Sequence, residues 1–248
     1  MMNRVLLTLP LLLSGPVLAA QCKVDLKNEI HLDGKAVEIY QEGGESAVVD
    51  ANNNLLIAGE VVSLSQEQKQ AIAEYRESLN SYIPQVKQMA QDGLALANNI
   101  VDDVATSFDM PGAFDSVKES MKSFYADVES RYYKNGDLIL PAETFGSMAD
   151  TWTQDLEKAG ELFNEEFIAS AFNAMSEKMK AEGGLNLTQM ADSMAELKER
   201  ISERLAEHEE DVIKQGQEFC DSLDEMAEQE QQLHQKIPEL KDYQIFTI

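Results

Sequence analysis

Residues 190–237 read MADSMAELKERISERLAEHEEDVIKQGQEFCDSLDEMAEQEQQLHQKI, and this stretch decides the fold. Its apolar side chains recur every three or four residues at first and then every seven, as in the seam of a long packed helix. A helix of about 45 residues is about 65 Å long, so we expect it to pack against at least two shorter helices in an elongated hairpin or bundle. Pro238 ends the pattern, because proline cannot continue a helix. The seam residues are Met190, Met194, Leu197, Ile201, Leu205, Val212, Phe219, Met226 and Leu233.

A second helical region begins at Ser65. Ser65 and Gln68 have the spacing of a capping box, in which each side chain satisfies a free amide of the first helical turn. Pro84 interrupts the pattern, so we expect a kink or break near it, and the helix fades by Gly112. The apolar stripe is Ile72, Tyr75, Leu79, Tyr82, Val86, Met89, Leu96 and Ile100.

Two further helices are predicted between these regions. One runs from Ala113 to about Tyr133, and the other begins at Pro141 and is stopped by Gly183-Gly184. Between them, Leu138–Leu140 is either a short strand or a buried linker. The second of these helices has the stripe Phe145, Met148, Trp152, Leu156, Ala159, Phe163, Phe167, Ala171, Met175 and Met179.

From residue 22 to residue 64 the apolar residues alternate in short runs, separated by turn-forming pairs such as Asp33-Gly34. This period of two predicts a small antiparallel β module. The sequence therefore predicts an α+β protein that is mainly α, with a signal peptide at 1–19, the β module at 20–64 and a long-helix bundle at 65–248. The candidate strands are Lys23–Leu26, Ala36–Tyr40, Ala47–Val49, Leu55–Ile57 and Val61–Leu64.

The first residues have the form of a secretory signal. Arg4 gives a basic start, the run Val5–Leu13 is apolar but too short to span a bilayer, and Val17 and Ala19 precede a cleavage site. No later stretch is apolar for long enough to form a membrane helix. We therefore expect an exported protein without a transmembrane segment.

The composition is strongly acidic, with a formal net charge of −25. Such a charge repels phosphate backbones, so nucleic-acid binding is excluded and adhesion to acidic membranes is disfavoured. The acidic surface serves either solubility or the attraction of divalent cations or a basic partner.

The two cysteines, Cys22 and Cys220, are 198 positions apart. An even number of cysteines in an oxidising compartment predicts pairing, and the alternative is two unrelated buried thiols. Their separation is too large for a redox motif, so we expect a structural disulfide.

No catalytic motif is present. The three histidines do not have the spacing of a metal-binding helix, and adjacent carboxylates such as Glu165-Glu166 diverge around a helix and remain solvated. We predict no metal, no cofactor and no catalytic residue. The alternative is an enzyme whose site is assembled from scattered residues near Trp152, Tyr132 and the acidic helices.

Four methionines form the one ambiguous signal: Met175 and Met179, then Met190 and Met194, are pairs at i,i+4. Flexible thioethers fill irregular cores, bind varied hydrophobic partners, or ligate cuprous ions. Core packing is the favoured interpretation, and a binding surface is the second.

The chain resembles the YggN-like family of bacterial envelope proteins, a domain of unknown function. The resemblance rests on Gln21-Cys22 after the signal, on the strand series that ends in Ser63-Leu64-Ser65, and on Cys220 late in the chain. Gln68, Tyr75, Leu79 and Pro84 also have the family's spacing. The resemblance implies a periplasmic location and supplies no activity.

These observations favour a periplasmic, non-enzymatic binding or scaffold protein that acts on another envelope protein or on itself. The alternative is a chaperone-like protein that holds unfolded clients on its methionine-rich or aromatic helix surfaces.

Overall fold

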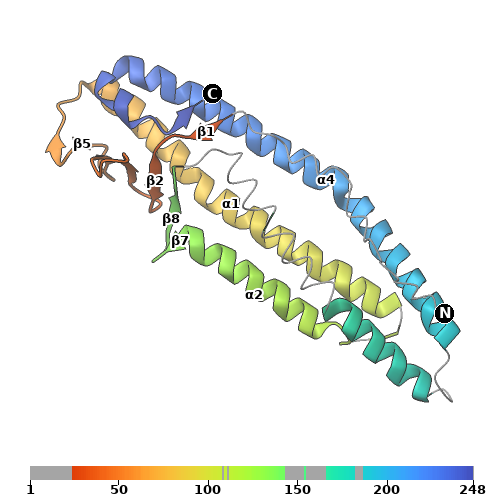
Figure 1. Ribbon diagram of the computed structural model, residues 1–248. Coiled ribbons are helices and arrows are strands. Elements are labelled where there is room, and N and C mark those ends of the chain that lie inside the picture. Colours follow the sequence, from red (N-terminus) through yellow and green to blue (C-terminus); the bar gives the residue numbers. More distant parts are fainter. Residues whose placement is uncertain are drawn as a thin grey trace, which may run out of the picture.

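The computed structural model of the chain describes residues 24–107, 109–110, 112–142, 154, 166–181 and 187–247. The described part is elongated and mainly helical, with an antiparallel sheet near one end (Figure 1). The α+β, mainly α fold is therefore confirmed. The predicted signal peptide, Cys22 and Trp152 lie outside the described residues.

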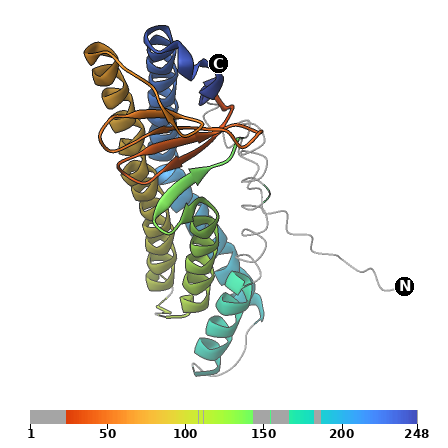
Figure 2. The same cartoon turned by 90° about the vertical axis from the view of Figure 1, so that its left-hand side faces the viewer.

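Two long helices form the body. α1 (Gln66–Ser107) and α4 (Leu187–Lys236) are about 63 and 75 Å long at 1.5 Å per residue. They lie side by side and run in opposite directions, and α2 (Asp115–Tyr132) lies beside α1 (Figures 1 and 2). Residues 166–181 are also helical, and this is the described part of the helix predicted from Pro141.

The sequence signals at the ends of the two long helices are confirmed. The Gln68 amide donates to Ser65 Oγ at 3.3 Å, and the Ser65 amide donates to Gln68 Oε1 at 2.8 Å, which completes the capping box. α4 ends before Pro238, which opens a short 3₁₀ helix, η1 (Pro238–Tyr243). The break predicted as one alternative at Pro84 is wrong, because α1 continues through that residue.

The main sheet has seven antiparallel strands in the order β6-β5-β4-β3-β2-β8-β7. Its inner side chains alternate with outer ones in β2, β3 and β4, as a half-buried sheet requires. A separate two-stranded sheet pairs β1 with β9 and so joins the two ends of the described chain. The strands are β1 (Asp25–Leu26), β2 (Glu29–Leu32), β3 (Val37–Tyr40), β4 (Ser46–Val49), β5 (Leu55–Ile57), β6 (Glu60–Val61), β7 (Tyr133–Lys134), β8 (Asp137–Leu140) and β9 (Phe246–Thr247).

The sheet is larger than the predicted β module. β2 and β7 were not among the candidate strands. β8 lies in the range 65–248 and confirms the short strand that was one of the two alternatives for Leu138–Leu140. Asn135 and Gly136 both have positive φ and form the tight turn that brings β8 back beside β7. β8 then pairs with β2, so the sheet and the helical region are interleaved along the chain.

The buried side chains form two cores. The first lies between the inner face of the sheet, the N-terminal half of α1, the C-terminal part of α4 and the C-terminal strand. The second lies at the opposite end, where Phe114 and Phe167 stack with ring centroids 4.4 Å apart. Between the cores, no α1 side chain from Pro84 to Asn99 is buried.

Candidate functional site

An apolar cavity of about 200 Å³ lies at the inner edge of the first core, where the sheet, α1, α2, α4 and the C-terminal strand meet. Its closed end consists of buried aliphatic side chains from all of these elements except α2. The closed end is lined by Ile30, Leu32, Leu79, Leu138, Leu223 and Ile245.

The cavity opens between α1 and α2. Ala90 of α1 is exposed, and Tyr125 and Val128 of α2 are partly exposed at the same opening. Lys87 and Glu129 lie here as well, and among the described residues they are the only charged side chains in the lining. The cavity is therefore apolar at its closed end and charged at its mouth.

Four tyrosines contribute their rings to the walls, and two of them direct their hydroxyls away from the cavity into backbone hydrogen bonds. Tyr82 donates to the Ser222 carbonyl at 2.8 Å, and Tyr133 donates to the Ile83 carbonyl at 3.3 Å. Burial raises the pKa of both phenols, so these hydroxyls stay protonated. Tyr82 and Tyr133 thus present apolar ring surface to the cavity rather than reactive oxygen.

An ion pair spans the mouth from α1 to α2. Lys87 Nζ lies 3.5 Å from Glu129 Oε1 and 5.9 Å from the centroid of the Tyr133 ring. The Lys87 side chain is 48% exposed and that of Glu129 is 36% exposed. An ion pair this exposed is weak, and its partners are available to a ligand.

The wall made by the C-terminal strand is held by one buried carboxylate. Glu230 of α4 is 1% exposed, and it accepts hydrogen bonds from the amides of Ile245 at 2.7 Å and Phe246 at 2.9 Å. The Tyr75 hydroxyl donates to the same side chain at 2.8 Å. Burial raises the pKa of Glu230, although these three hydrogen bonds oppose the shift.

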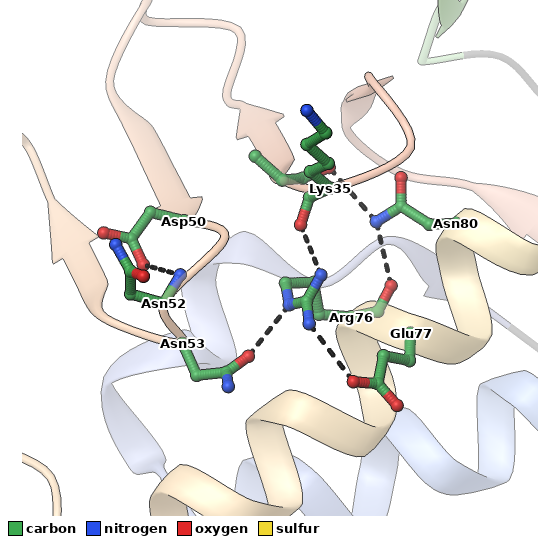
Figure 3. Close-up of polar contacts among 8 residues, drawn as sticks. Lys35, Asp50, Asn52, Asn53, Arg76, Glu77 and Asn80 are labelled. Atoms are coloured by element: carbon green, nitrogen blue, oxygen red, sulfur yellow. Dashed lines mark hydrogen bonds and ion pairs between the residues drawn. The ribbon is translucent and has the colours of Figure 1, made fainter.

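The sheet is held over α1 by polar side chains of that helix (Figure 3). Arg76 donates from Nε to Asn53 Oδ1 at 2.8 Å and from Nη1 to the Lys35 carbonyl, so it reaches two different turns of the sheet. Asn80 accepts from the Gly34 amide at 2.8 Å and donates to the Ala36 carbonyl at 3.2 Å. These contacts fix the position of the sheet on α1, and hence of the sheet residues that line the cavity.

A wider groove of about 740 Å³ lies on the surface between the β5–β6 edge and η1. It is open and mostly polar, and its lining includes the carboxylates Glu45, Glu60, Glu239 and Asp242. The apolar cavity is the better candidate site, because it is more enclosed and its lining comes from five separate segments.

The predicted methionine surface is divided between core and undescribed positions. Met175 and Met179 are 4% and 6% exposed in the second core, and Met194 packs against that core. The side chain of Met190 lies outside the described ones. Met175 and Met179 therefore have the packing role that was the favoured interpretation of the sequence.

The predicted disulfide cannot be traced, since Cys22 lies outside the described residues. Cys220 is 5% exposed on α4. Leu26, four positions after Cys22, lines the same cavity as Phe219, the neighbour of Cys220. The bridge stays a prediction.

The three histidines lie in different surroundings, and His208 is a partly exposed residue of α4. His31 lies on the outer face of the sheet, 2.7 Å from Glu29 and with its ring centroid 4.7 Å from that of Tyr40. His234 is half-buried on α4, and burial lowers its pKa. In the described part of the chain, no three His, Cys, Asp or Glu side chains are grouped closely enough to hold a metal ion.

Sequence reasoning did not find the cavity, although it named several of the residues around it. Tyr82 and Val86 were placed on the α1 stripe, and Tyr132 was named in the scattered-site alternative. Their meeting depends on β8 pairing with β2, which no local pattern indicates. The usable signal was the presence of Tyr82 and Tyr132 on two helical stripes, since tyrosine suits walls with one apolar and one polar side.

One comparison with known proteins found a match. A sequence profile of the family described as "Protein of unknown function (DUF2884)" matches residues 22–246. The chain therefore belongs to the DUF2884 family. No curated protein and no solved structure matches it. None of the helices in the described ranges has the length and apolar character needed to cross a membrane.

Proposed function

We propose that this DUF2884 protein is a non-enzymatic binding protein of the bacterial periplasm that holds an apolar group in the cavity beneath its sheet. The observation that carries the proposal is the cavity itself, which is enclosed at one end, open at the other and almost free of polar lining atoms. Cavities of this kind stay dry and bind apolar molecules, because water finds no hydrogen-bond partners in them.

The periplasmic location is supported by the signal-like start and by the resemblance to the YggN-like family. A structural disulfide between Cys22 and Cys220 belongs to the same proposal, because an oxidising compartment favours pairing. The signal-like start and Cys22 lie outside the described residues, so the location and the disulfide remain proposals.

The cavity is large enough for a useful ligand. A water molecule occupies about 30 Å³ in the liquid and a methylene group is of similar size, so about 200 Å³ accommodates roughly six or seven methylene groups. Burial of each methylene contributes about 0.8 kcal/mol, so a chain that fills the cavity gains about 5 kcal/mol before the cost of association. We therefore expect weak to moderate affinity for a single unbranched chain.

A binding role fits the chemistry of the walls better than catalysis does. Tyr82 and Tyr133 are protonated and hydrogen-bonded to backbone carbonyls. The remaining charged groups, Lys87 and Glu129, are paired at a solvent-exposed mouth. General acid–base catalysis places its acid or base within a closed site, whereas Lys87 and Glu129 lie where solvent reaches them.

The test is a calorimetric titration of the purified protein with neutral straight-chain alcohols from pentan-1-ol to decan-1-ol. Affinity should rise about fourfold per methylene and level off near seven or eight carbons, when the cavity is full. Absence of binding across the series would overturn the proposed function.

A substitution at the mouth locates the site. Ala90→Trp places a large ring at the cavity opening and should abolish binding, while the exposed position leaves the fold intact. Ala95→Trp is the matched control, because Ala95 is an exposed alanine of the same helix that does not line the cavity. Equal loss of binding in both variants would mean that the alcohols bind elsewhere.

A second candidate function is docking of an envelope protein on the helix at 166–181. Ile168 and Phe172 are 41% and 50% exposed and are one helical turn apart, so they form one apolar patch. This patch also offers a chaperone-like protein a surface for clients, whereas Met175 and Met179 are buried. Crosslinking in envelope extract that is lost in Phe172→Asp but retained in Ala90→Trp would support it.

A further inference from the structure

Resting on the proposed function, we propose that the ligand is a straight-chain carboxylate of about eight carbons, with its chain in the cavity and its carboxylate at Lys87. The cavity changes from wholly apolar at Leu79 to charged at Lys87. These residues are eight positions apart on α1, which corresponds to about 12 Å along the helix axis. A site with this gradient fits a molecule that has one apolar end and one polar end.

The length of the chain follows from the volume. Six or seven methylene-sized groups fill the space beneath the sheet. In an eight-carbon acid, seven carbons precede the carboxylate, so the carboxylate reaches the mouth. A shorter chain leaves an empty apolar end, and a longer chain extends into solvent without further gain. Eight carbons is therefore the expected optimum.

Lys87 is the group at the mouth that can hold an anion. Its ammonium has three donors, but it lies 3.5 Å from Glu129, beyond the usual length of a charge-assisted hydrogen bond. Within the described part of the chain it makes this one ion pair and an approach to the Tyr133 ring. A ligand carboxylate can therefore bond to Lys87 and replace the looser contact with Glu129.

The negative net charge of the whole chain does not prevent an anion from binding at the mouth of the cavity. A net charge of −25 repels anions at long range, yet salt screens such fields beyond about 8 Å at physiological ionic strength. At the mouth the local charges dominate, and there Lys87 attracts the carboxylate while Glu129 competes with it. Removal of Glu129 should therefore strengthen binding, and removal of Lys87 should weaken it.

The experiment compares octanoate, octan-1-ol and octylamine on the full chain at pH 7.5 by calorimetry. Octanoate should bind about fivefold more tightly than octan-1-ol, as expected for one exposed ion pair. Lys87→Met should remove this preference, so that octanoate binds no more tightly than octan-1-ol. Glu129→Gln should raise the affinity for octanoate. Lys122→Met, which removes an exposed charge of α2 away from the lining, is the control and should change nothing.

The outcomes separate the two proposals. If none of the three compounds binds, the proposed function itself fails. If octan-1-ol binds but octanoate binds no more tightly, or if Lys87→Met keeps the preference, the carboxylate assignment fails while the apolar site stands. Tighter binding of octylamine than of octanoate would also overturn the assignment. It would mean that the ligand carries a cationic head group that pairs with Glu129.

Discussion

The Tyr75 hydroxyl donates a hydrogen bond of 2.8 Å to Glu230 in the middle of the first core, and so connects α1 to α4 through two buried side chains. The same carboxylate accepts the amides of Ile245 and Phe246, which form one wall of the cavity. One side chain thus holds the two long helices and the C-terminal strand together. Loss of its partners should affect the fold and the cavity at once.

Tyr75→Phe tests this connection by removing one oxygen and leaving the ring. A hydrogen bond to a charged, buried acceptor contributes about 1.5 to 3 kcal/mol, so the free energy of unfolding should fall by about that amount. Urea denaturation measures it. Tyr125→Phe is the control, because the Tyr125 hydroxyl makes no hydrogen bond within the described residues, and its effect should be near zero. Equal effects of the two substitutions would contradict the role of Tyr75.

The dependence of stability on pH gives a second prediction for Glu230. Burial raises its pKa in the folded state above the ordinary value of 4.5. The folded protein therefore binds this proton more tightly than the unfolded chain does, and the resulting stability is present below pH 4.5 and lost as the pH rises through the folded pKa.

The measurement compares wild type with Glu230→Gln by urea denaturation between pH 4 and pH 8. The difference in the free energy of unfolding, wild type minus variant, should fall as the pH rises above 4.5 and then become constant. His234 titrates in both proteins, so its contribution cancels. A difference that rises with pH would show that the hydrogen bonds outweigh burial in setting the pKa.

Arg76→Met tests how the sheet is held on α1. The substitution keeps the apolar stem but removes the hydrogen bonds to Asn53 and to the Lys35 carbonyl. We expect a loss of about 2 kcal/mol in the free energy of unfolding, because both partners lose a charged donor. Arg200→Met is the control, since its exposed ion pair with Glu196 is 3.7 Å long and should contribute less than about 0.5 kcal/mol. A change in Arg76→Met no larger than in the control would show that the hydrogen bonds of Arg76 do not hold the sheet.

The sequence was informative wherever a local pattern determines structure. The capping box at Ser65 and Gln68, the end of α4 before Pro238 and the alternating strands β3 and β4 each follow from spacing or from one residue type. The continuity of α1 through Pro84 did not follow. Packing of the preceding segment, including buried Leu79, outweighs the one hydrogen bond that proline removes.

The cavity could not be predicted, because long-range pairing creates it. The pairing of β8 with β2 and of β9 with β1 brings residues more than 100 positions apart to one place. Glu230 looked like one of many solvated carboxylates, and only the position of the C-terminal strand makes it a buried acceptor. The local pattern of α4 predicts a helix, but it does not predict which element packs against each face of that helix.

Met175→Ala distinguishes a packing role from a client-binding role for the methionines. Met175 is 4% exposed in the second core, so its truncation should lower the free energy of unfolding by about 2 to 5 kcal/mol. Met89→Ala is the control, because Met89 is 36% exposed on α1 and should change stability by less than about 0.5 kcal/mol. Unchanged stability together with lost client holding in Met175→Ala would restore the predicted methionine surface.

Reduction of the proposed Cys22–Cys220 bridge should loosen one core and spare the other. Val24 is fully buried in the first core and Leu26 shares the cavity with Phe219, so the bridge would join the start of the β region to α4 beside that core. A crosslink that closes a loop of almost 200 residues stabilises a protein by about 4 to 5 kcal/mol in the chain-entropy description.

Thiol titration of the unfolded, unreduced protein should find no free thiol, and reductant should lower the melting temperature. Hydrogen exchange then separates the two ends of the molecule. After reduction the amide of Lys27, which donates to the Ile245 carbonyl at 2.8 Å, should lose protection, because β1 and β9 pair only with each other. The amide of Val117, in the distant second core, should keep its protection. Two titratable thiols, or protection lost equally in both cores, would show that no bridge anchors the β region to α4.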